Sequence, residues 1–133
     1  MRLRGVGTDI VDVRRFARLV ERASFTSRWF TVREMGHCLD REDAPGALAA
    51  LFAAKEAAWK ALRIEWRGGV PWSQMEVLPH GGGFAVVLTR DVALAAEAVG
   101  VQRILVTTAV EGDLAMAHAL AVLHPAQPSS DAR

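Results

Sequence analysis

Several features that assign a chain to a particular class of protein are missing from this sequence. Cys38 is the only cysteine, so the chain forms no internal disulfide and offers no cysteine cluster to a metal. No stretch is apolar for the roughly 20 residues that a membrane-spanning helix needs, and no apolar run follows the basic start as in a signal peptide. We therefore expect a protein of the reduced cytoplasm with no membrane partner.

The net charge is too small for a protein that coats a polyanion. It is +1, which argues against a nucleic-acid partner. The charge is unevenly spread, because residues 1–41 hold nine arginines against five acidic residues, whereas residues 42–133 hold seven basic against ten acidic residues. A basic N-terminal patch of this kind either docks an acidic partner or is a solvated helix face, and both interpretations stay open.

Apolar periodicity divides the first half of the chain into one strand and three helices. LRGVGTDIVDV is typical of a short strand, and Asp12 is a suitable N-cap for a helix that continues to about Ala23. Thr31, with Glu34 three residues later, predicts a capping box at the start of a short helix. The alanine-rich residues 47–62 give the strongest helix prediction in the chain.

The second half is predicted to consist mainly of strands. QMEVLPHGGGFAVVLT is typical of two strands around a glycine turn, and RDVALAAEAVG of an amphipathic helix that ends at Gly100. RILVTTAV and LAMAHALAVL follow as two strands. The last strand has alanines on one face, which lets a helix or another chain approach closely, and on the other face His118, interpreted as a core histidine. We predict one α+β domain over residues 1–123 and a disordered tail over residues 124–133.

Three charged residues are candidates for a reactive site. Asp9 ends the first strand behind two glycines, which leave the backbone open to a ligand. Glu56 and Lys60 are four residues apart on one predicted helix and therefore share a face. One carboxylate from a strand and one from a helix suit Mg²⁺, which takes one or two carboxylates plus phosphate oxygens. A turn-forming aspartate and an exposed Glu–Lys pair are the alternatives, and spacing alone does not exclude them.

Three segments carry a resemblance to a known family. GVGTDIVDVRRF, FTVRE and FAAKEAAWKA, in this order and with these gaps, resemble signature segments of the holo-acyl-carrier-protein synthases, the small 4′-phosphopantetheinyl transferases. The resemblance covers roughly residues 3–123 and implies that family's fold, an antiparallel sheet packed against helices in a single domain. It implies Mg²⁺-dependent transfer of the 4′-phosphopantetheine arm of coenzyme A to a serine of an apo acyl carrier protein, with release of 3′,5′-ADP. It also implies a homotrimer.

The resemblance assigns roles to individual residues. Asp9 and Glu56 match the family's Mg²⁺ ligands, and Lys60 matches the lysine that neutralises or protonates the leaving group. Glu56 and a water on the metal are both candidates for the base that accepts the serine proton. Lys55 and Lys60 are expected to contact the coenzyme. The residues expected to bind the acidic recognition helix of the carrier protein are Arg14, Arg15, Arg18 and Arg22.

The sequence departs from the family pattern at three places on the coenzyme side. Leu51 stands where the family has an arginine, ALRIEWRGG lacks a Gly-Thr-Gly turn, and VTTA at 106–109 replaces a Ser-x-Ser-His-like segment. Arg63 and Arg67 are candidates to replace the missing coenzyme contacts. Three interpretations stay open: an active transferase with rearranged coenzyme contacts, an enzyme with the same metal geometry and another substrate, or a catalytically impaired member that binds a carrier protein or acts as an assembly subunit.

Overall fold

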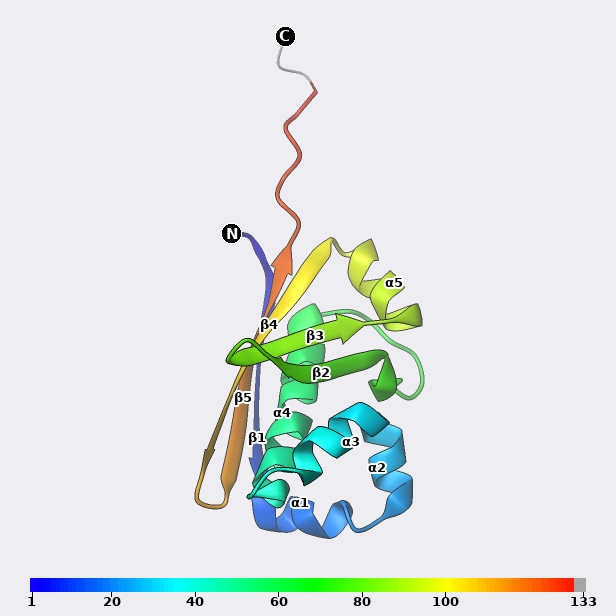
Figure 1. Cartoon of the computed structure of the whole chain (residues 1–133). Coiled ribbons are helices and arrows are strands. Elements are labelled where there is room, and N and C mark those ends of the chain that lie inside the picture. The colour runs from blue at the N-terminus through cyan, green and yellow to red at the C-terminus, as the bar shows by residue number, and fades with distance from the viewer. Residues whose placement is uncertain (131–133) are drawn as a thin grey trace.

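The protein combines a three-stranded sheet, a separate hairpin and five α-helices in a computed structural model that describes residues 1–130 (Figure 1). The helices are α1 (Val13–Leu19), α2 (Ala23–Trp29), α3 (Val32–Leu39), α4 (Ala44–Leu62) and α5 (Arg90–Ala98). The strands are β1 (Leu3–Asp12), β2 (Met75–His80), β3 (Gly83–Leu88), β4 (Val101–Glu111) and β5 (Leu114–Leu123). All strand pairs are antiparallel, and β5 lies between β1 and β4. The predicted α+β class is confirmed.

The long helix α4 packs against one face of the sheet, as Figure 1 shows. The alanine face of β5 makes this possible, because small side chains allow helix and sheet to approach closely. The four alanines of β5 that face α4 are at most 1% exposed: Ala115, Ala117, Ala119 and Ala121. The sequence left open whether a helix or another chain covers this face, and the structure shows that α4 does.

Gly5 and Gly7 bring α4 directly onto the backbone of β1. A Cβ atom at Gly7 would collide with the carbonyl oxygen of Ala57, and one at Gly5 with that of Ala61. No larger residue fits at either place without moving the helix away from the strand. Asp9 follows two residues after Gly7 on the same face of β1, so the contact that the glycines permit also positions this carboxylate beside α4.

The first strand is longer, and the helix after it shorter, than the sequence predicted. β1 continues past Asp9 to Asp12, which caps α1 by accepting a hydrogen bond of 3.1 Å from the backbone N–H of Arg15. The expected helix to Ala23 ends at Leu19, and α2 begins after a turn. This turn folds α2 back, so that the rings of Phe25 and Phe16 lie 5.8 Å apart, edge to face. Burial of aromatic surface therefore explains the break.

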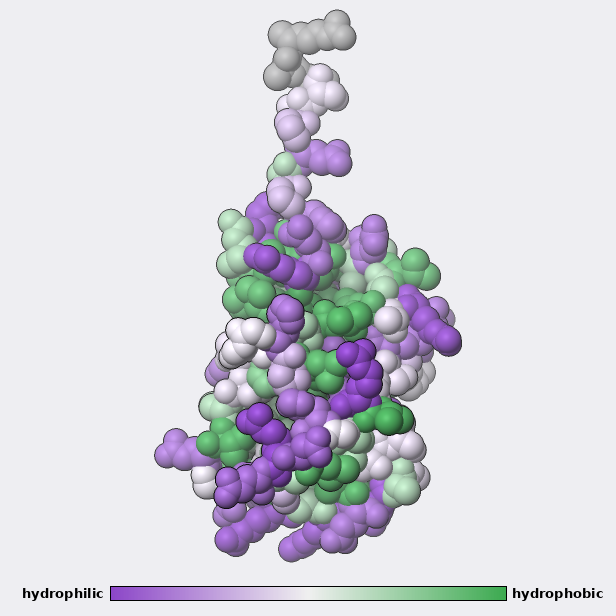
Figure 2. All heavy atoms as spheres, viewed as in Figure 1, coloured by the Kyte–Doolittle hydropathy of each residue, from purple (hydrophilic) through white to green (hydrophobic). Residues whose placement is uncertain are grey.

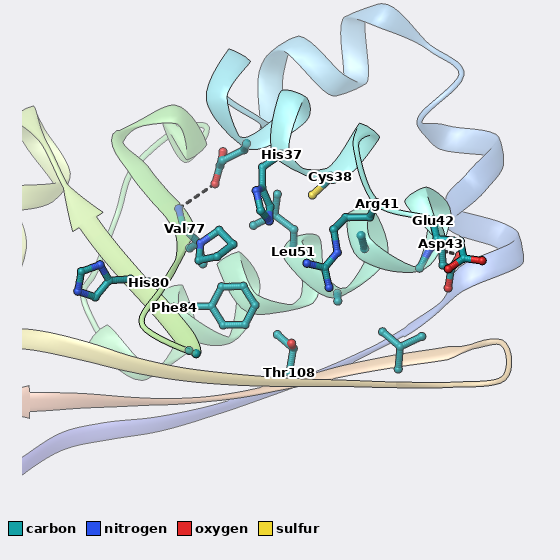
Figure 3. A pocket seen from close by; sticks show the side chains of 18 of the residues that line it. His37, Cys38, Arg41, Glu42, Asp43, Leu51, Val77, His80, Phe84 and Thr108 are labelled. Atoms are coloured by element: carbon teal, nitrogen blue, oxygen red, sulfur yellow. Dashed lines mark hydrogen bonds between the residues drawn. The ribbon is translucent and has the colours of Figure 1, made fainter.

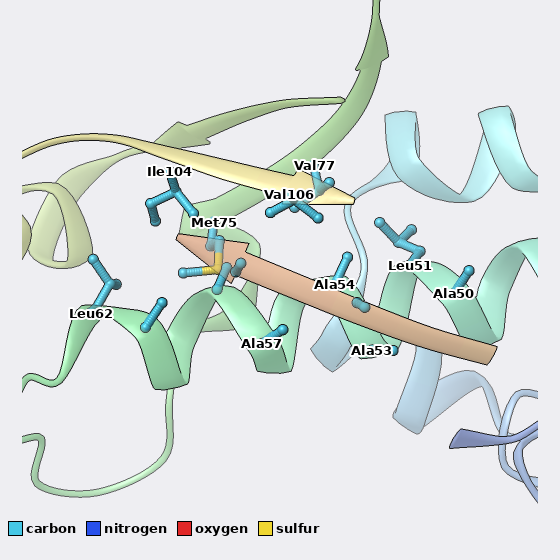
Figure 4. Close-up of a cluster of buried hydrophobic side chains, with 14 of the residues drawn as sticks. Ala50, Leu51, Ala53, Ala54, Ala57, Leu62, Met75, Val77, Ile104 and Val106 are labelled. Carbon is cyan, nitrogen blue, oxygen red and sulfur yellow. The ribbon is translucent and has the colours of Figure 1, made fainter. Parts of the chain in front are cut away.

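Several other local predictions agree with the structure. Thr31 and Glu34 form both hydrogen bonds of the capping box that starts α3. The hairpin turn lies at 81–82, and Gly100, with a φ of +81°, follows the C-cap residue Val99 of α5. Figure 4 shows how the hairpin and sheet close the core: on α4, Leu51, Ala54, Ala57 and Leu62 lie near Met75, Val77, Ile104 and Val106.

The outward face of the sheet is exposed in the single chain and carries several large apolar side chains, with a polar row of Thr8, His118 and Thr107 across its middle. His118 lies on this face at the centre of β5, where its Nδ1 is 3.0 Å from the hydroxyl oxygen of Thr8, and it is exposed. Its interpretation as a core histidine is therefore wrong for one chain alone. No helix among residues 1–130 is both long and apolar enough to span a bilayer. The predicted tail contains no helix or strand over 124–130, and its last residues, 131–133, lie outside the described part.

Candidate active site

Two elements place the three candidate residues side by side. Asp9 extends from β1 toward α4, and Lys60 lies in the last turns of α4. The Lys60 ammonium nitrogen is 3.1 Å from Asp9 Oδ1 and donates a second hydrogen bond of 3.2 Å to the backbone carbonyl of Thr8. The Asp9 side chain is 14% exposed and that of Lys60 51%, so a largely enclosed carboxylate meets a solvent-accessible ammonium group.

Glu56 lies one helical turn before Lys60 and close to Asp9. Burial raises the pKa of the Glu56 carboxyl above its ordinary value, and the charge of Asp9 and a hydrogen bond with Asp9 raise it further, while the Lys60 charge partly offsets the shift. Burial is the largest cause of the raised pKa of Glu56, and the nearby Asp9 carboxylate adds to it. Residues that are far apart in sequence thus form an acid pair with one adjacent ammonium group.

The donor set of this site fits a hard divalent cation such as magnesium rather than a metal that prefers thiolate or imidazole ligands. Among residues 1–130 no group of three or more histidine, cysteine, aspartate or glutamate side chains could hold a metal ion. Asp9 and Glu56 supply hard carboxylate oxygens only, and Mg²⁺ is commonly bound by one or two carboxylates, with waters and substrate phosphates as its other ligands. A cation bound between the two carboxylates would relieve the repulsion that Asp9 contributes to the raised pKa of Glu56.

Lys55 does not reach the site surface, although the sequence placed it with the coenzyme contacts. Its side chain is 0% exposed, and its ammonium nitrogen lies 2.7 Å from Glu34 Oε1. The other oxygen of Glu34 accepts a hydrogen bond of 2.9 Å from the backbone N–H of Val77. Burial lowers the pKa of Lys55, and the Glu34 charge opposes that shift. Because the pair joins α3, β2 and α4 inside the core, we leave Lys55 out of the proposed coenzyme contacts.

The periodicity of α4 contains a signal that could have revealed this buried pair. Lys55 lies four residues after Leu51 and three before Ala58, which puts it on the buried stripe of the helix rather than on the face of Glu56. Sequence reasoning assigned Lys55 by its chemistry and not by its face. It found Glu34 only as a capping residue, since the second role of this carboxylate depends on long-range packing.

The two candidate arginines lie beyond the C-terminal end of α4. Arg63 adopts a left-handed backbone conformation, with a φ of +50°, and its side chain packs against Gly5 of β1. Arg4 donates hydrogen bonds to the backbone carbonyls of Leu62 and Arg63 and so caps the helix. Arg67 is exposed in the following loop. Arg63 therefore lies on the Asp9 side of the strand, whereas no contact ties Arg67 to the carboxylates in the described structure.

The predicted carrier-binding arginines form an exposed group on and after α1. Arg14, Arg15, Arg18 and Arg22 are all exposed. Arg14 forms an ion pair of 3.1 Å with Asp113, and its side chain remains 78% exposed. In the space-filling view the end of the molecule where α1 lies is covered largely by hydrophilic side chains (Figure 2). This surface stays predicted as a docking face.

Comparison with known proteins settles the family. Residues 5–119 match the family model described as the 4′-phosphopantetheinyl transferase superfamily. The chain belongs to this superfamily. It is 40% identical over 117 residues to the holo-[acyl-carrier-protein] synthase of Geotalea daltonii, an alignment that spans 85% of this chain and 93% of the relative.

Solved structures of holo-[acyl-carrier-protein] synthases share the fold of this superfamily member. The crystal structure from Neisseria meningitidis has a TM-score of 0.80 at 27% identity and covers 91% of this chain and 99% of that chain. A coenzyme A complex of the synthase described as from Chronobacterium ammoniagenes has a TM-score of 0.79 at 27% identity, with coverages of 91% and 98%. The resemblance and the fold predicted from the sequence are thus confirmed.

Two positions that depart from the superfamily pattern lie together at a cavity. Leu51 and Thr108 line a cavity of about 620 Å³ between α3, the start of α4, the β2–β3 turn and β4 (Figure 3). It borders the face of α4 opposite Glu56. Phe84 and Leu51 make part of the wall apolar, and the polar groups at the rim include His37, Arg41, Glu42, Asp43 and His80. Leu51 is only 6% exposed and serves the core.

Proposed function

We propose that the protein transfers the 4′-phosphopantetheine arm of coenzyme A to a serine of an apo acyl carrier protein. The observation that carries the proposal is the convergence of Asp9, Glu56 and Lys60 at the contact of β1 with α4. The names of the relatives support it, since the Geotalea daltonii protein is a holo-[acyl-carrier-protein] synthase and a solved relative is a complex with coenzyme A. We propose a cytoplasmic location, in line with the single buried cysteine.

Asp9 and Glu56 would hold Mg²⁺ in this reaction. The ion would supply positive charge to the oxygens of the pyrophosphate, where charge builds up during phosphoryl transfer. The two carboxylates are fixed by β1 and α4, so the site is organised before any substrate arrives. That matters because phosphoryl transfer depends mainly on positioning and charge neutralisation.

Lys60 would neutralise charge on the leaving group, and Glu56 is a candidate for the base in the transfer. The carrier serine oxygen forms a bond to the phosphorus next to pantetheine, and the bond from that phosphorus to the bridging oxygen breaks, which releases 3′,5′-ADP. The exposed Lys60 ammonium neutralises the departing oxygen. Glu56 and a water on the ion are both candidates to accept the serine proton.

The exposed arginines of α1 would bind the carrier protein. Arg15 and Arg22 have no ion-pair partner among the described residues and are free to meet an acidic helix. Reversing both to glutamate is expected to slow carrier modification at least tenfold through a higher KM for the carrier, because attraction becomes repulsion. The affinity for coenzyme A, measured by calorimetry, should stay unchanged. Unaltered carrier kinetics would contradict docking at α1.

A homotrimer is the assembly that we propose for the active protein. The outward face of the sheet exposes several large apolar residues to solvent: Val6 at 61%, Ile10 at 57%, Leu105 at 40% and Leu114 at 52%. The strand register places Val6 and Leu105 on either side of Leu120. Several large apolar side chains exposed on one face of a sheet are typical of a surface that another chain covers.

Intact-mass spectrometry tests the proposed transfer. Incubation of the protein with apo carrier protein, coenzyme A and Mg²⁺ should add one phosphopantetheine arm to the carrier. Asp9→Ala and Glu56→Gln should lose this activity, while Glu97→Gln, a carboxylate on α5 outside the site, should keep it. A carrier of unchanged mass with the wild-type protein, across several carrier proteins, would refute the proposal.

The cavity favours a second candidate, a catalytically impaired member that binds a carrier protein or acts as an assembly subunit. Leu51 is a core residue where the family pattern has an arginine, and the cavity it lines carries two carboxylates, Glu42 and Asp43, close to Arg41. Calorimetric titration with coenzyme A and Mg²⁺ separates the candidates, because an impaired member would bind the carrier without measurable heat from the coenzyme.

A further inference from the structure

The ammonium group of Lys60 forms an ion pair with Asp9, one of the two carboxylates that bind the cation in the proposed function. Lys60 Nζ lies 3.1 Å from Asp9 Oδ1 and 3.2 Å from the carbonyl oxygen of Thr8. We propose that Lys60 and a divalent cation compete for Asp9, so that binding of the cation releases the Lys60 ammonium toward the phosphate substrate. This inference rests on the metal site of the proposed function. It adds that the cation binds first and that Lys60 then becomes free to contact the phosphate.

Electrostatics make joint occupancy of Asp9 unfavourable. A magnesium ion binds a carboxylate oxygen at about 2.0–2.1 Å, and an ammonium group on the same carboxylate would then lie within a few ångströms of a doubly charged ion. The Asp9 side chain is only 14% exposed, so water screens this repulsion poorly. One of the two positive groups therefore has to leave.

Lys60 is the partner that can move. Its side chain is 51% exposed and belongs to the last turns of α4, where a long flexible side chain can turn into solvent. The backbone of Asp9 stays in place when Lys60 moves, because the close contacts at Gly5 and Gly7 hold β1 against the backbone of α4. The cation would thus find its carboxylates in place, and the freed ammonium would stay within reach of an anion bound beside them.

Divalent binding to variants of the free protein tests the competition. Mn²⁺ is the probe, and the electron paramagnetic resonance signal of the free ion reports binding without coenzyme or carrier. Lys60→Gln should bind Mn²⁺ about fivefold more tightly than the wild type, equivalent to about 1 kcal/mol. The matched control is Arg33→Gln, which removes one positive charge from another exposed ion pair of 3.1 Å and should leave the affinity unchanged. Asp9→Asn should abolish binding.

Amine labelling provides a direct view of Lys60 itself. The chain has only two lysines, and Lys55 is fully buried, so Lys60 is the one side chain that an acylating reagent can reach readily. Saturating Mg²⁺ should raise the labelling rate of Lys60 severalfold, as read by peptide mass spectrometry. Lys55 should remain unlabelled and serves as the internal check that the fold is intact.

The outcomes separate this inference from the proposed function. Equal Mn²⁺ affinity in the wild type and Lys60→Gln, or Lys60 labelling that Mg²⁺ leaves unchanged or slows, overturns the competition while the metal site stands. No Mn²⁺ binding by the wild type or by Lys60→Gln overturns both, because the carboxylate pair then holds no cation. Tighter binding by Lys60→Gln together with faster Lys60 labelling supports the competition, whether or not the carrier assay succeeds.

Discussion

At the scale of single residues, the two lysines of α4 have opposite environments. Lys55 is fully buried against Glu34, whereas the Lys60 side chain is 51% exposed and contacts Asp9. Five positions apart, the two side chains leave the helix in different directions, one into the core and one to the surface. The two side chains are chemically identical. Their different burial therefore gives Lys55 a structural role and Lys60 a role in the proposed reaction.

Removing the buried ammonium should destabilise the protein. Lys55→Met is expected to lower the free energy of unfolding by about 3–5 kcal/mol, because the Glu34 charge is left buried without its partner. Lys60→Met, at an exposed ion pair on the same helix, should cost at most about 1 kcal/mol. Urea denaturation followed by circular dichroism measures both. In the double variant Lys55→Met/Glu34→Gln no buried charge remains, so a loss as large as that of Lys55→Met would contradict this explanation.

The buried thiol of Cys38 should be unreactive and should make stability depend on pH. Burial and the Glu34 charge raise the pKa of Cys38 to about 11, although Arg41 opposes the shift. At pH 8 a thiol reagent should therefore react about a hundredfold more slowly with the folded than with the unfolded protein. Because the pKa of Cys38 in the folded protein exceeds its ordinary value of 9.0, the free energy of unfolding should fall as pH rises from 9 to about 11. Cys38→Ala should lack that component of the decline.

At the scale of elements, the contact between β1 and α4 builds the site. Gly5 and Gly7 let the helix rest on the strand, and Asp9 and Lys60 meet across that contact. The sequence indicated both elements and the glycines, but it misplaced the end of the strand and missed the break between α1 and α2. Local patterns failed there because burial of Phe16 and Phe25, a tertiary effect, decides where the chain turns.

Gly7→Ala tests this contact. The added methyl group would collide with the carbonyl oxygen of Ala57, so α4 and β1 must separate. We expect a loss of about 1–3 kcal/mol in the free energy of unfolding, and weaker Mn²⁺ binding because Asp9 and Glu56 move apart. Gly36→Ala is the matched control, since nothing lies within 4 Å of the new methyl group inside α3. That control should stabilise the helix by about 0.5–1 kcal/mol, and a Gly7→Ala protein of equal stability would contradict the close-contact explanation.

At the scale of the whole molecule, the outward face of the sheet is exposed in a single chain and would be buried in the proposed trimer. This face carries exposed Val6 and Ile10 on β1, and His118 on β5 lies in its middle. The alanine-rich inner face is already filled by α4. In the proposed trimer the association surface is therefore the face with large apolar residues. It is not the alanine face, which the sequence suggested as compatible with another chain.

Ile10→Asp tests the assembly. A charge on the outward face should convert the proposed trimer into monomers, because burying an unpaired carboxylate in an apolar interface is costly. Leu94→Asp is the control, since Leu94 is 71% exposed on α5, away from the sheet, and should leave the molar mass unchanged. Light scattering after size-exclusion chromatography gives the mass. A wild-type protein that is monomeric at all concentrations would end the trimer proposal.

The sequence by itself determined the fold class, the capping residues of α1 and α3, and the membership of the family, because these depend on local chemistry and on motif order. The resemblance already implied that Asp9, Glu56 and Lys60 share one site, but the contacts between individual charged groups were decided only by the tertiary structure. It buried Lys55 against Glu34 and brought Lys60 to Asp9, residues 51 positions apart. Spacing along one helix determines which side chains share a face. The residues that contact this face come from distant segments of the chain. Here the small side chains of β5 (alanines) and of β1 (glycines) let α4 pack closely enough for those contacts to form.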